Sequence, residues 1–120
     1  MEIRKLKKRR EFVDLSRNGQ KVVLNNLILL YKASNDCLHE TNNSYVRLGF
    51  VASKKIGNAV ERNRAKRRLK AAVNLSITIH SAPFYDFVII ARKNVLKSDF
   101  IEIIKELNYA LLKANLRKPL

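Results

Sequence analysis

The chain has 120 residues, 47% of them hydrophobic, so it is long enough to bury the core of one domain and too short for two. Its 25 lysines and arginines outnumber ten acids and give a formal net charge of +15, an excess typical of proteins that bind a polyanion. The single Cys37 excludes an internal disulfide, His39 and His80 lack the spacing of metal ligands, and no apolar run approaches the ~20 residues of a membrane helix.

The first predicted element is a short amphipathic helix over residues 8–18. Phe12 and Leu15 lie three positions apart and share its apolar face. Gly19 follows the last helical residue, where we expect the left-handed backbone conformation that often ends a helix. The charged residues before this helix contain no apolar core of a signal peptide, which favours a cytoplasmic protein with no membrane partner.

Strands are predicted next. Residues 22–32 are rich in β-branched and aromatic side chains and are predicted as strand, with an interruption near Asn25 and Asn26. Residues 33–44 are polar and are expected to form a surface loop. In residues 45–53 apolar side chains recur at every second position, which predicts a further strand with one face on the core.

The second half of the chain is predicted to form a helix, a strand and a last helix. Residues 57–75 carry a narrow apolar face on an otherwise basic helix, and residues 77–83 form a connection. Residues 84–92 are continuously apolar, which predicts a central strand buried on both faces. Asp99 and Glu102 resemble a capping box at the start of the last helix. The buried stripe of that helix is expected to comprise Phe100, Ile103, Leu107, Leu111 and Ala114.

This order of helix, two or three strands, helix, strand and helix predicts an α/β (α+β) two-layer sandwich in which helices cover one sheet. The chain shows no internal repeat and no low-complexity linker, so we expect one binding domain over residues 1–120. Residues 1–7 are expected to be flexible in the absence of a ligand.

The positive charge is clustered. Residues 1–10 and 54–70 hold fourteen of the 25 basic residues, whereas residues 97–106 are nearly balanced. A solvated basic face is the simplest alternative. Clustering favours a binding surface, because general solubility requires no clusters and is served better by acids.

The second cluster is predicted to lie on a helix. Arg62, Lys66 and Lys70 are spaced by four and share one face, and Arg64 and Arg68 form a second row. Like charges at these spacings destabilise an isolated helix unless phosphates neutralise them, and the planar guanidinium binds phosphate through two parallel hydrogen bonds. We also expect open backbone N–H groups at the helix entrance, around residues 57–58, to favour a phosphate.

The segment from Ser53 to Arg67 also strongly resembles the signature of the protein subunit of bacterial ribonuclease P. The family pattern runs roughly S-K-K-x-G-N-A-V-x-R-N-R-x-K-R, and the chain follows it without a gap. The resemblance extends more loosely over residues 6–116. It implies an α-β-β-β-α-β-α order with a left-handed β-α-β crossover.

The resemblance implies a function as well. Members of this family are the small protein part of a ribonucleoprotein whose RNA removes the 5′ leader of precursor tRNA. The implied partners are ribonuclease P RNA and precursor tRNA, with no obligatory protein partner, and the implied cofactor is Mg²⁺ held mainly by the RNA. The chain would thus be an enzyme subunit without catalytic residues of its own.

The resemblance also implies two sets of site residues. The residues expected to bind the RNA subunit are Lys54, Lys55, Gly57, Asn58, Arg62, Asn63, Arg64, Lys66, Arg67 and Arg68. The residues expected to bind the leader are Phe12, Ser16, Tyr31, Lys55, Arg92 and Lys93. Aromatic side chains can stack unpaired bases of any sequence. Family members often carry a second aromatic where this chain has Ser16, so we expect weaker stacking here.

The sequence leaves alternatives open. Phe12 and Tyr31 could simply be core residues, and Arg92 and Lys93 could be charges at a strand end. A ribosomal-type RNA-binding module would use the same basic surfaces, and a DNA-binding recognition helix is a weaker alternative, since strands and no helix-turn-helix precede the basic helix. A nuclease of protein alone is not indicated, because the acids are scattered and the histidines have no evident partner.

Overall fold

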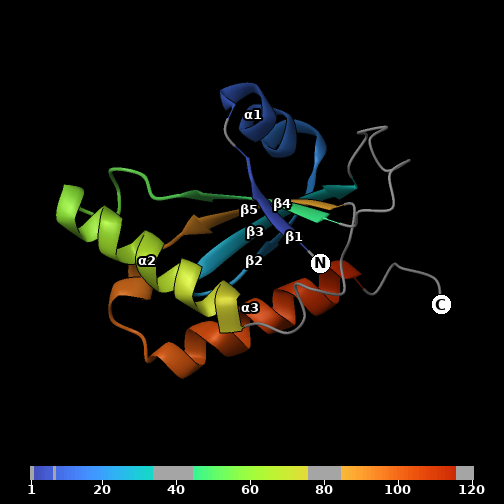
Figure 1. The fold of residues 1–120 in the computed structure, drawn as a ribbon. Helices are drawn as coiled ribbons and strands as arrows, with labels where there is room; N and C mark the ends of the chain where they lie inside the picture. Colours follow the sequence, from blue (N-terminus) through green and yellow to red (C-terminus); the bar gives the residue numbers. More distant parts are fainter. Residues whose placement is uncertain (1, 7, 34–44, 76–84, 116–120) are drawn as a thin grey trace.

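The computed structural model describes residues 2–6, 8–33, 45–75 and 85–115, which form one sheet with helices on both faces (Figure 1). The sheet has five strands in the order β1-β4-β5-β3-β2. Along the chain the elements are β1 (Glu2–Lys5), α1 (Arg9–Asn18), β2 (Gln20–Val23), β3 (Leu27–Ala33), β4 (Tyr45–Val51), α2 (Ala59–Leu75), β5 (Tyr85–Ala91), the 3-10 helix η3 (Lys93–Leu96) and α3 (Phe100–Asn115).

The predicted class and the order α-β-β-β-α-β-α are confirmed from α1 to α3. The structure adds a strand that the sequence did not predict. Residues 2–5, expected to be flexible, form β1 and pair in parallel with residues 45–48 of β4. Most of the predicted loop over residues 33–44 and the connection over residues 77–83 lie outside the described residues.

The pairing of the strands explains the interruption predicted near Asn25 and Asn26. These residues connect β2 to β3. The two strands pair as antiparallel neighbours, with Gln20 opposite Tyr31. β3 is antiparallel to β5, and β4 is parallel to β5. The parallel strands β4 and β5 are joined through α2, and the left hand of this crossover stays a prediction.

The core lies on both faces of the sheet. The larger cluster packs α2 and α3 on one face, and the smaller cluster, which contains Leu6, Leu15, Leu30 and Val88, lies under α1 on the other face. β5 contributes Phe87 and Ile89 to the first cluster and Val88 to the second, so its predicted burial on both faces is confirmed. The predicted two layers therefore become three, because α1 covers the face opposite α2 and α3 (Figure 1).

Helix α1 ends differently from the prediction. Gly19 has a φ of −84°, so it does not adopt the left-handed conformation. A Cβ at this position would lie 2.6 Å from the carbonyl oxygen of Leu15 and 2.9 Å from that of Tyr31. Glycine is needed here because the backbones of α1 and β3 approach closely.

Across the described residues, no helix has the length and apolar character needed to cross a membrane.

Candidate nucleic-acid interface

Two adjoining hollows lie between α1 and α2 beside β1 and β4, and we call them together the α1–α2 groove. Their volumes are about 430 and 390 Å³, and both are lined by Phe12, Phe50 and Lys66. The other residues of the larger hollow are Lys5, Leu6, Leu48, Gly49, Lys70, Val73 and Asn74, and those of the smaller are Arg9, Val51 and Ala52.

The groove combines aromatic rings with positive charge. The Nζ of Lys70 lies 5.8 Å from the centre of the Phe50 ring, within the range of a cation–π contact. Lys5, Arg9 and Lys66 add three further cations, and none of the described lining residues is acidic. Aromatic faces beside a row of cations suit unpaired bases and the phosphates that join them.

The described residues of β1 pair with only part of β4. The pairing ends at Leu48, whose carbonyl accepts a hydrogen bond from the Leu6 N–H at 3.0 Å. Since residues along a strand alternate sides, the backbone of Phe50 points to the same side, where β1 no longer covers β4. Among the described residues, the β1 pairing therefore ends one residue before Gly49, and the partly exposed Phe50 lies beyond it in the groove.

Phe12 rests directly on β4. A Cβ at Gly49 would lie only 2.6 Å from two carbon atoms of the Phe12 ring, Cε1 and Cζ. Only glycine lets the ring approach the strand so closely. Phe12 is half-buried, and it therefore serves the core and the groove at once.

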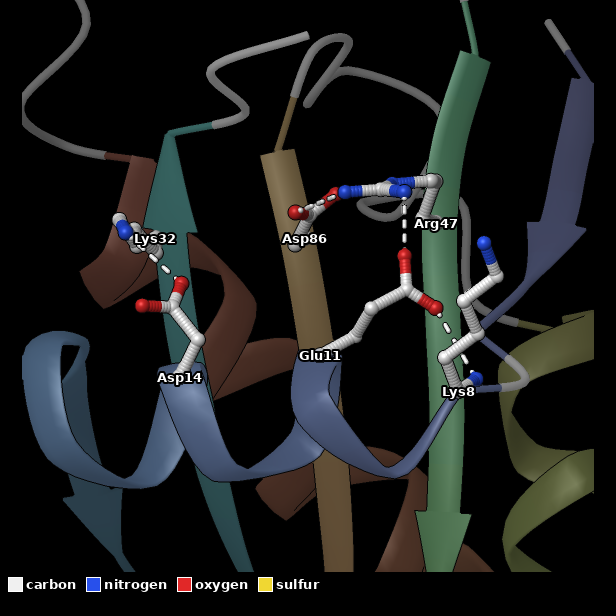
Figure 2. A network of polar contacts seen from close by, with 6 residues as sticks. All are labelled: Lys8, Glu11, Asp14, Lys32, Arg47 and Asp86. Carbon is white, nitrogen blue, oxygen red and sulfur yellow. Dashed lines mark hydrogen bonds and ion pairs between the residues drawn. The ribbon is translucent and has the colours of Figure 1, made fainter.

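A network of charges holds α1 over the sheet (Figure 2). Lys32, Asp86 and Arg47 are register neighbours on β3, β5 and β4, so positive, negative and positive charges alternate across the strands. Arg47 donates Nε and Nη2 to the two carboxylate oxygens of Asp86 at 2.8 and 2.7 Å, and Nη1 to Glu11 at 2.6 Å. The Lys32 Nζ contacts Asp14 at 2.8 Å. Both acids of α1 thus meet a cation of the sheet.

Asp14 gives the fold an acid-sensitive contact. Hydrogen bonds from Lys32 and then Asn18 hold the pKa of the Asp14 carboxyl below its ordinary value. Because the pKa is lower in the folded chain, this contact stabilises the fold above the unfolded-state pKa, about 4, and is lost as the pH falls through the folded-state pKa.

We therefore expect Asp14→Asn to lower the free energy of unfolding near neutral pH. The difference from the wild type should disappear as the pH falls below the folded-state pKa of Asp14. Urea unfolding followed by circular dichroism at a series of pH values measures this difference. A difference that stays constant down to the lowest pH would contradict the assignment.

The start of α2 corrects one prediction. The Asn58 Oδ1 accepts from the Glu61 N–H at 2.8 Å, and the Glu61 Oε1 accepts from the Asn58 N–H at 3.0 Å, a capping box. Gly57 has a φ of +146°, and a Cβ there would collide with the Glu61 carboxylate. Arg62 closes this turn by donating Nη1 to the Gly57 carbonyl at 2.8 Å. Gly57 and Asn58 thus shape the helix start, and the carboxylate occupies the expected phosphate position.

Only some of the polar and basic side chains of α2 line the groove. Lys66 and Lys70 line the groove, whereas Asn63, Arg64 and Arg67 are exposed outside it. Arg68 is different, because its Nη2 donates to the Ser98 carbonyl and its Nε is buried without a partner among the described residues. Arg68 therefore connects α2 to the segment before α3.

The residues expected to bind the leader do not come together as predicted. The grouping of Tyr31 with Phe12 is wrong, because Tyr31 is only 6% exposed and belongs to the core cluster on the opposite face of the sheet. Its hydroxyl donates to the Gln20 Oε1 at 2.7 Å. Arg92 is directed to the β2–β3 turn, where its Nη1 donates to the Leu24 carbonyl at 2.8 Å.

The remaining predicted residues are exposed but lie outside the lining of the groove. Ser16 is exposed on α1, one turn after Phe12, and Lys93 is exposed at the start of η3. Lys54 and Lys55 are exposed in the turn that follows β4. They could meet RNA only beyond the groove.

The sequence did not identify Phe50 as a groove residue. Its place in the strand alternation indicated a core side chain, and it does pack partly against the larger cluster. Lys5 and Arg9 were recognised only as members of a basic cluster. No local signal distinguishes them, because Lys5 on β1 and Arg9 on α1 come beside Phe50 of β4 only in the folded chain.

In the described part of the chain, no three His, Cys, Asp or Glu side chains gather where they could hold a metal ion. Glu11 and Asp86 instead contact Arg47 in the network of Figure 2. The donor set is therefore unlike the clustered carboxylates that bind Mg²⁺.

Comparison with known proteins gives concordant results. The family model described as Ribonuclease P matches residues 2–115. A ribonuclease P protein component from Gluconacetobacter diazotrophicus is 34% identical over 113 residues, which cover 94% of this chain and 92% of that protein. One from Caulobacter vibrioides is 46% identical over 67 residues, and there the match spans 56% of this chain and only 45% of the relative's length.

Solved structures agree in fold. The ribonuclease P protein of Staphylococcus aureus aligns over 92% of this chain and 94% of its own, with a TM-score of 0.67 and 26% identity. That of Thermotoga maritima aligns over 96% and 97% of the two chains with a TM-score of 0.65, and at 23% identity it supports the fold alone. A family match over nearly the whole chain, together with a relative above 30% identity over most of its length, shows that this chain belongs to the ribonuclease P protein family.

Proposed function

We propose that this chain is the protein subunit of ribonuclease P, and that it assists an RNA catalyst in removing the 5′ leader of precursor tRNA. The observation that carries this proposal within the family is the α1–α2 groove. It brings two phenylalanine rings and four cations together beside β4. Rings and cations in this arrangement bind a single strand largely independently of its sequence, which suits leaders that differ among precursors.

The difference between lining and non-lining side chains of α2 suggests a division of work. Lys66 and Lys70 face the groove and would meet the phosphates of the leader. Asn63, Arg64 and Arg67 are exposed and are absent from the lining of the groove, and we assign them to the RNA subunit. One rigid helix would then position the leader relative to the catalytic RNA, and positioning of this kind lowers the barrier without a catalytic side chain.

Mg²⁺ enters this proposal as an ion held mainly by the RNA, where it would supply charge neutralisation and an activated water for cleavage. The protein would contribute cations that reduce the repulsion between phosphates. The cytoplasmic location predicted from the sequence remains part of the same proposal.

The test is cleavage of a 5′-extended precursor tRNA at low Mg²⁺ by the protein alone, by cognate ribonuclease P RNA alone, and by both together. We expect cleavage at the mature 5′ end to be much faster with both. If the protein binds structured RNA without stimulating cleavage, the alternative of a ribosomal-type binding module takes its place.

Arg64→Ala is expected to weaken assembly with the RNA subunit more than Lys113→Ala, which removes a cation of α3 that lies 5.9 Å from the Tyr109 ring. Each phosphate contact releases counterions, so loss of one contact should reduce the log–log salt slope of assembly by about 1. Filter binding over a range of KCl concentrations measures both quantities. Equal losses for the two variants would indicate diffuse charge without a defined site.

A further inference from the structure

The position of the Phe12 ring depends on how α1 is held against β4. The ring is packed on the backbone of Gly49 and lines both hollows of the groove. A small shift of α1 away from β4 would therefore move the ring and change the width of the groove. Apolar packing does not fix this spacing by itself, because it is not directional.

Glu11 supplies a directional contact at this place. Its Oε2 accepts from the Arg47 Nη1 at 2.6 Å, and its Oε1 accepts from the Lys8 N–H at 3.1 Å. Glu11 precedes Phe12 in the chain, and Arg47 lies two residues before Gly49 on β4. The carboxylate thus bridges the turn of α1 that carries the ring to the strand that supports it.

The strand end of this bridge is itself fixed. Two further donors of Arg47 are bound by Asp86, which is only 8% exposed. The guanidinium therefore cannot follow Glu11 if α1 moves. The planar guanidinium of Arg47 has three donors with fixed partners. It therefore fixes the distance between α1 and β4 more closely than the flexible ammonium of a lysine would.

We infer that Glu11 is a positioning residue that holds the Phe12 ring in place for stacking on an unpaired RNA base, a role that rests on the proposed function of the groove. This role and simple electrostatics predict opposite changes in RNA binding when Glu11 is removed. Glu11 is an acid beside a cationic groove, so by electrostatics alone its removal would strengthen the binding of a polyanion. The positioning role predicts weaker binding.

The experiment measures the dissociation constant of a single-stranded RNA of about ten nucleotides by fluorescence anisotropy, using the full chain at one salt concentration. We expect Glu11→Ala to weaken binding by about threefold to tenfold, a part of what stacking of one base supplies. Asp14→Ala is the matched control, because it also removes an acid of α1 and its contact with a strand lysine, Lys32. It should bind as tightly as the wild type or more tightly.

Two further readouts separate positioning from loss of structure. In a Phe12→Leu background, Glu11→Ala should cause no additional weakening, because the ring that it positions is gone. The fluorescence quenching of a 2-aminopurine base in the RNA should also decrease with Glu11→Ala. Should that variant not fold, Glu11→Gln, which retains an acceptor, is expected to show a smaller loss in the same direction.

Each outcome has one meaning. If Phe12→Leu binds RNA like the wild type, the groove does not stack bases and the proposed leader site fails. If Phe12→Leu weakens binding while Glu11→Ala binds as well as the wild type or better, only the positioning role of Glu11 is overturned. A loss with Asp14→Ala equal to that with Glu11→Ala would also overturn it, because any contact of α1 would then suffice.

Discussion

Arg47→Ala is expected to lower the free energy of unfolding by about 3 kcal/mol. The guanidinium forms the centre of the network in Figure 2, with its side chain 24% exposed and that of Asp86 12% exposed. Removal of the cation leaves a carboxylate in the middle of the sheet without its bidentate partner. The lysine next to Asp86 in the register, Lys32, is already held by Asp14 and cannot replace it without releasing α1.

Equilibrium unfolding in urea, followed by circular dichroism, measures this loss. Arg47→Ala combined with Asp86→Ala is the informative control, because it removes the uncompensated carboxylate as well. If the charge left behind causes the loss, the double variant should be at least as stable as the single one. A single-variant loss within about 0.5 kcal/mol, the range of ordinary surface substitutions, would show that the network does not stabilise the fold.

The elements of the fold could be predicted from the sequence because their signals are local. The apolar spacing of residues 57–75 and the continuous apolar run of residues 84–92 correspond to α2 and to the central strand β5. β1 could not be predicted in this way. Its four residues, EIRK, carry no pattern of their own and become a strand only because β4 offers an edge beside them.

The same distinction applies to the site. The basic cluster of α2 is visible in the sequence, since it lies within one segment. Which of its members are available to RNA depends on tertiary contacts, such as those of Arg62 with Gly57 and of Arg68 with Ser98. The misplacement of Tyr31 arose because an aromatic in a strand can face either side, and the pleat of β3 directs this one to the α2 and α3 side.

A further physical lesson concerns the acids. The ten acids are a minority in a chain of net charge +15, yet Glu11, Asp14 and Asp86 hold α1 on the sheet, and Glu61 caps α2. These acids contact Arg47, Lys32 and the start of α2, and none of them lines the groove. The described lining of the groove therefore contains cations and no acid. The distribution of acids thus determines which positive charges a nucleic acid can reach.

Replacing the two rings of the groove should have the largest effect on RNA binding. Phe12→Leu and Phe50→Leu each retain an apolar side chain of similar size and remove the aromatic face. We expect each to weaken the binding of single-stranded RNA by about 1–2 kcal/mol, or about fivefold to thirtyfold, since loss of one stacked base costs about 1–3 kcal/mol. Fluorescence anisotropy at fixed salt measures the loss, which should be much smaller for an RNA whose bases are replaced by abasic sites.

Tyr109→Leu is the matched control for these two variants. Tyr109 is 54% exposed on α3, and the Lys113 Nζ lies 5.9 Å from its ring, close to the 5.8 Å between Lys70 and Phe50. The two sites thus present an aromatic ring with a neighbouring lysine, and only one of them lies in the groove. Equal losses for Tyr109→Leu and Phe50→Leu would mean that RNA binds any exposed ring beside a cation. A loss confined to Phe12 and Phe50 would locate stacking in the groove, where both rings line the same hollows.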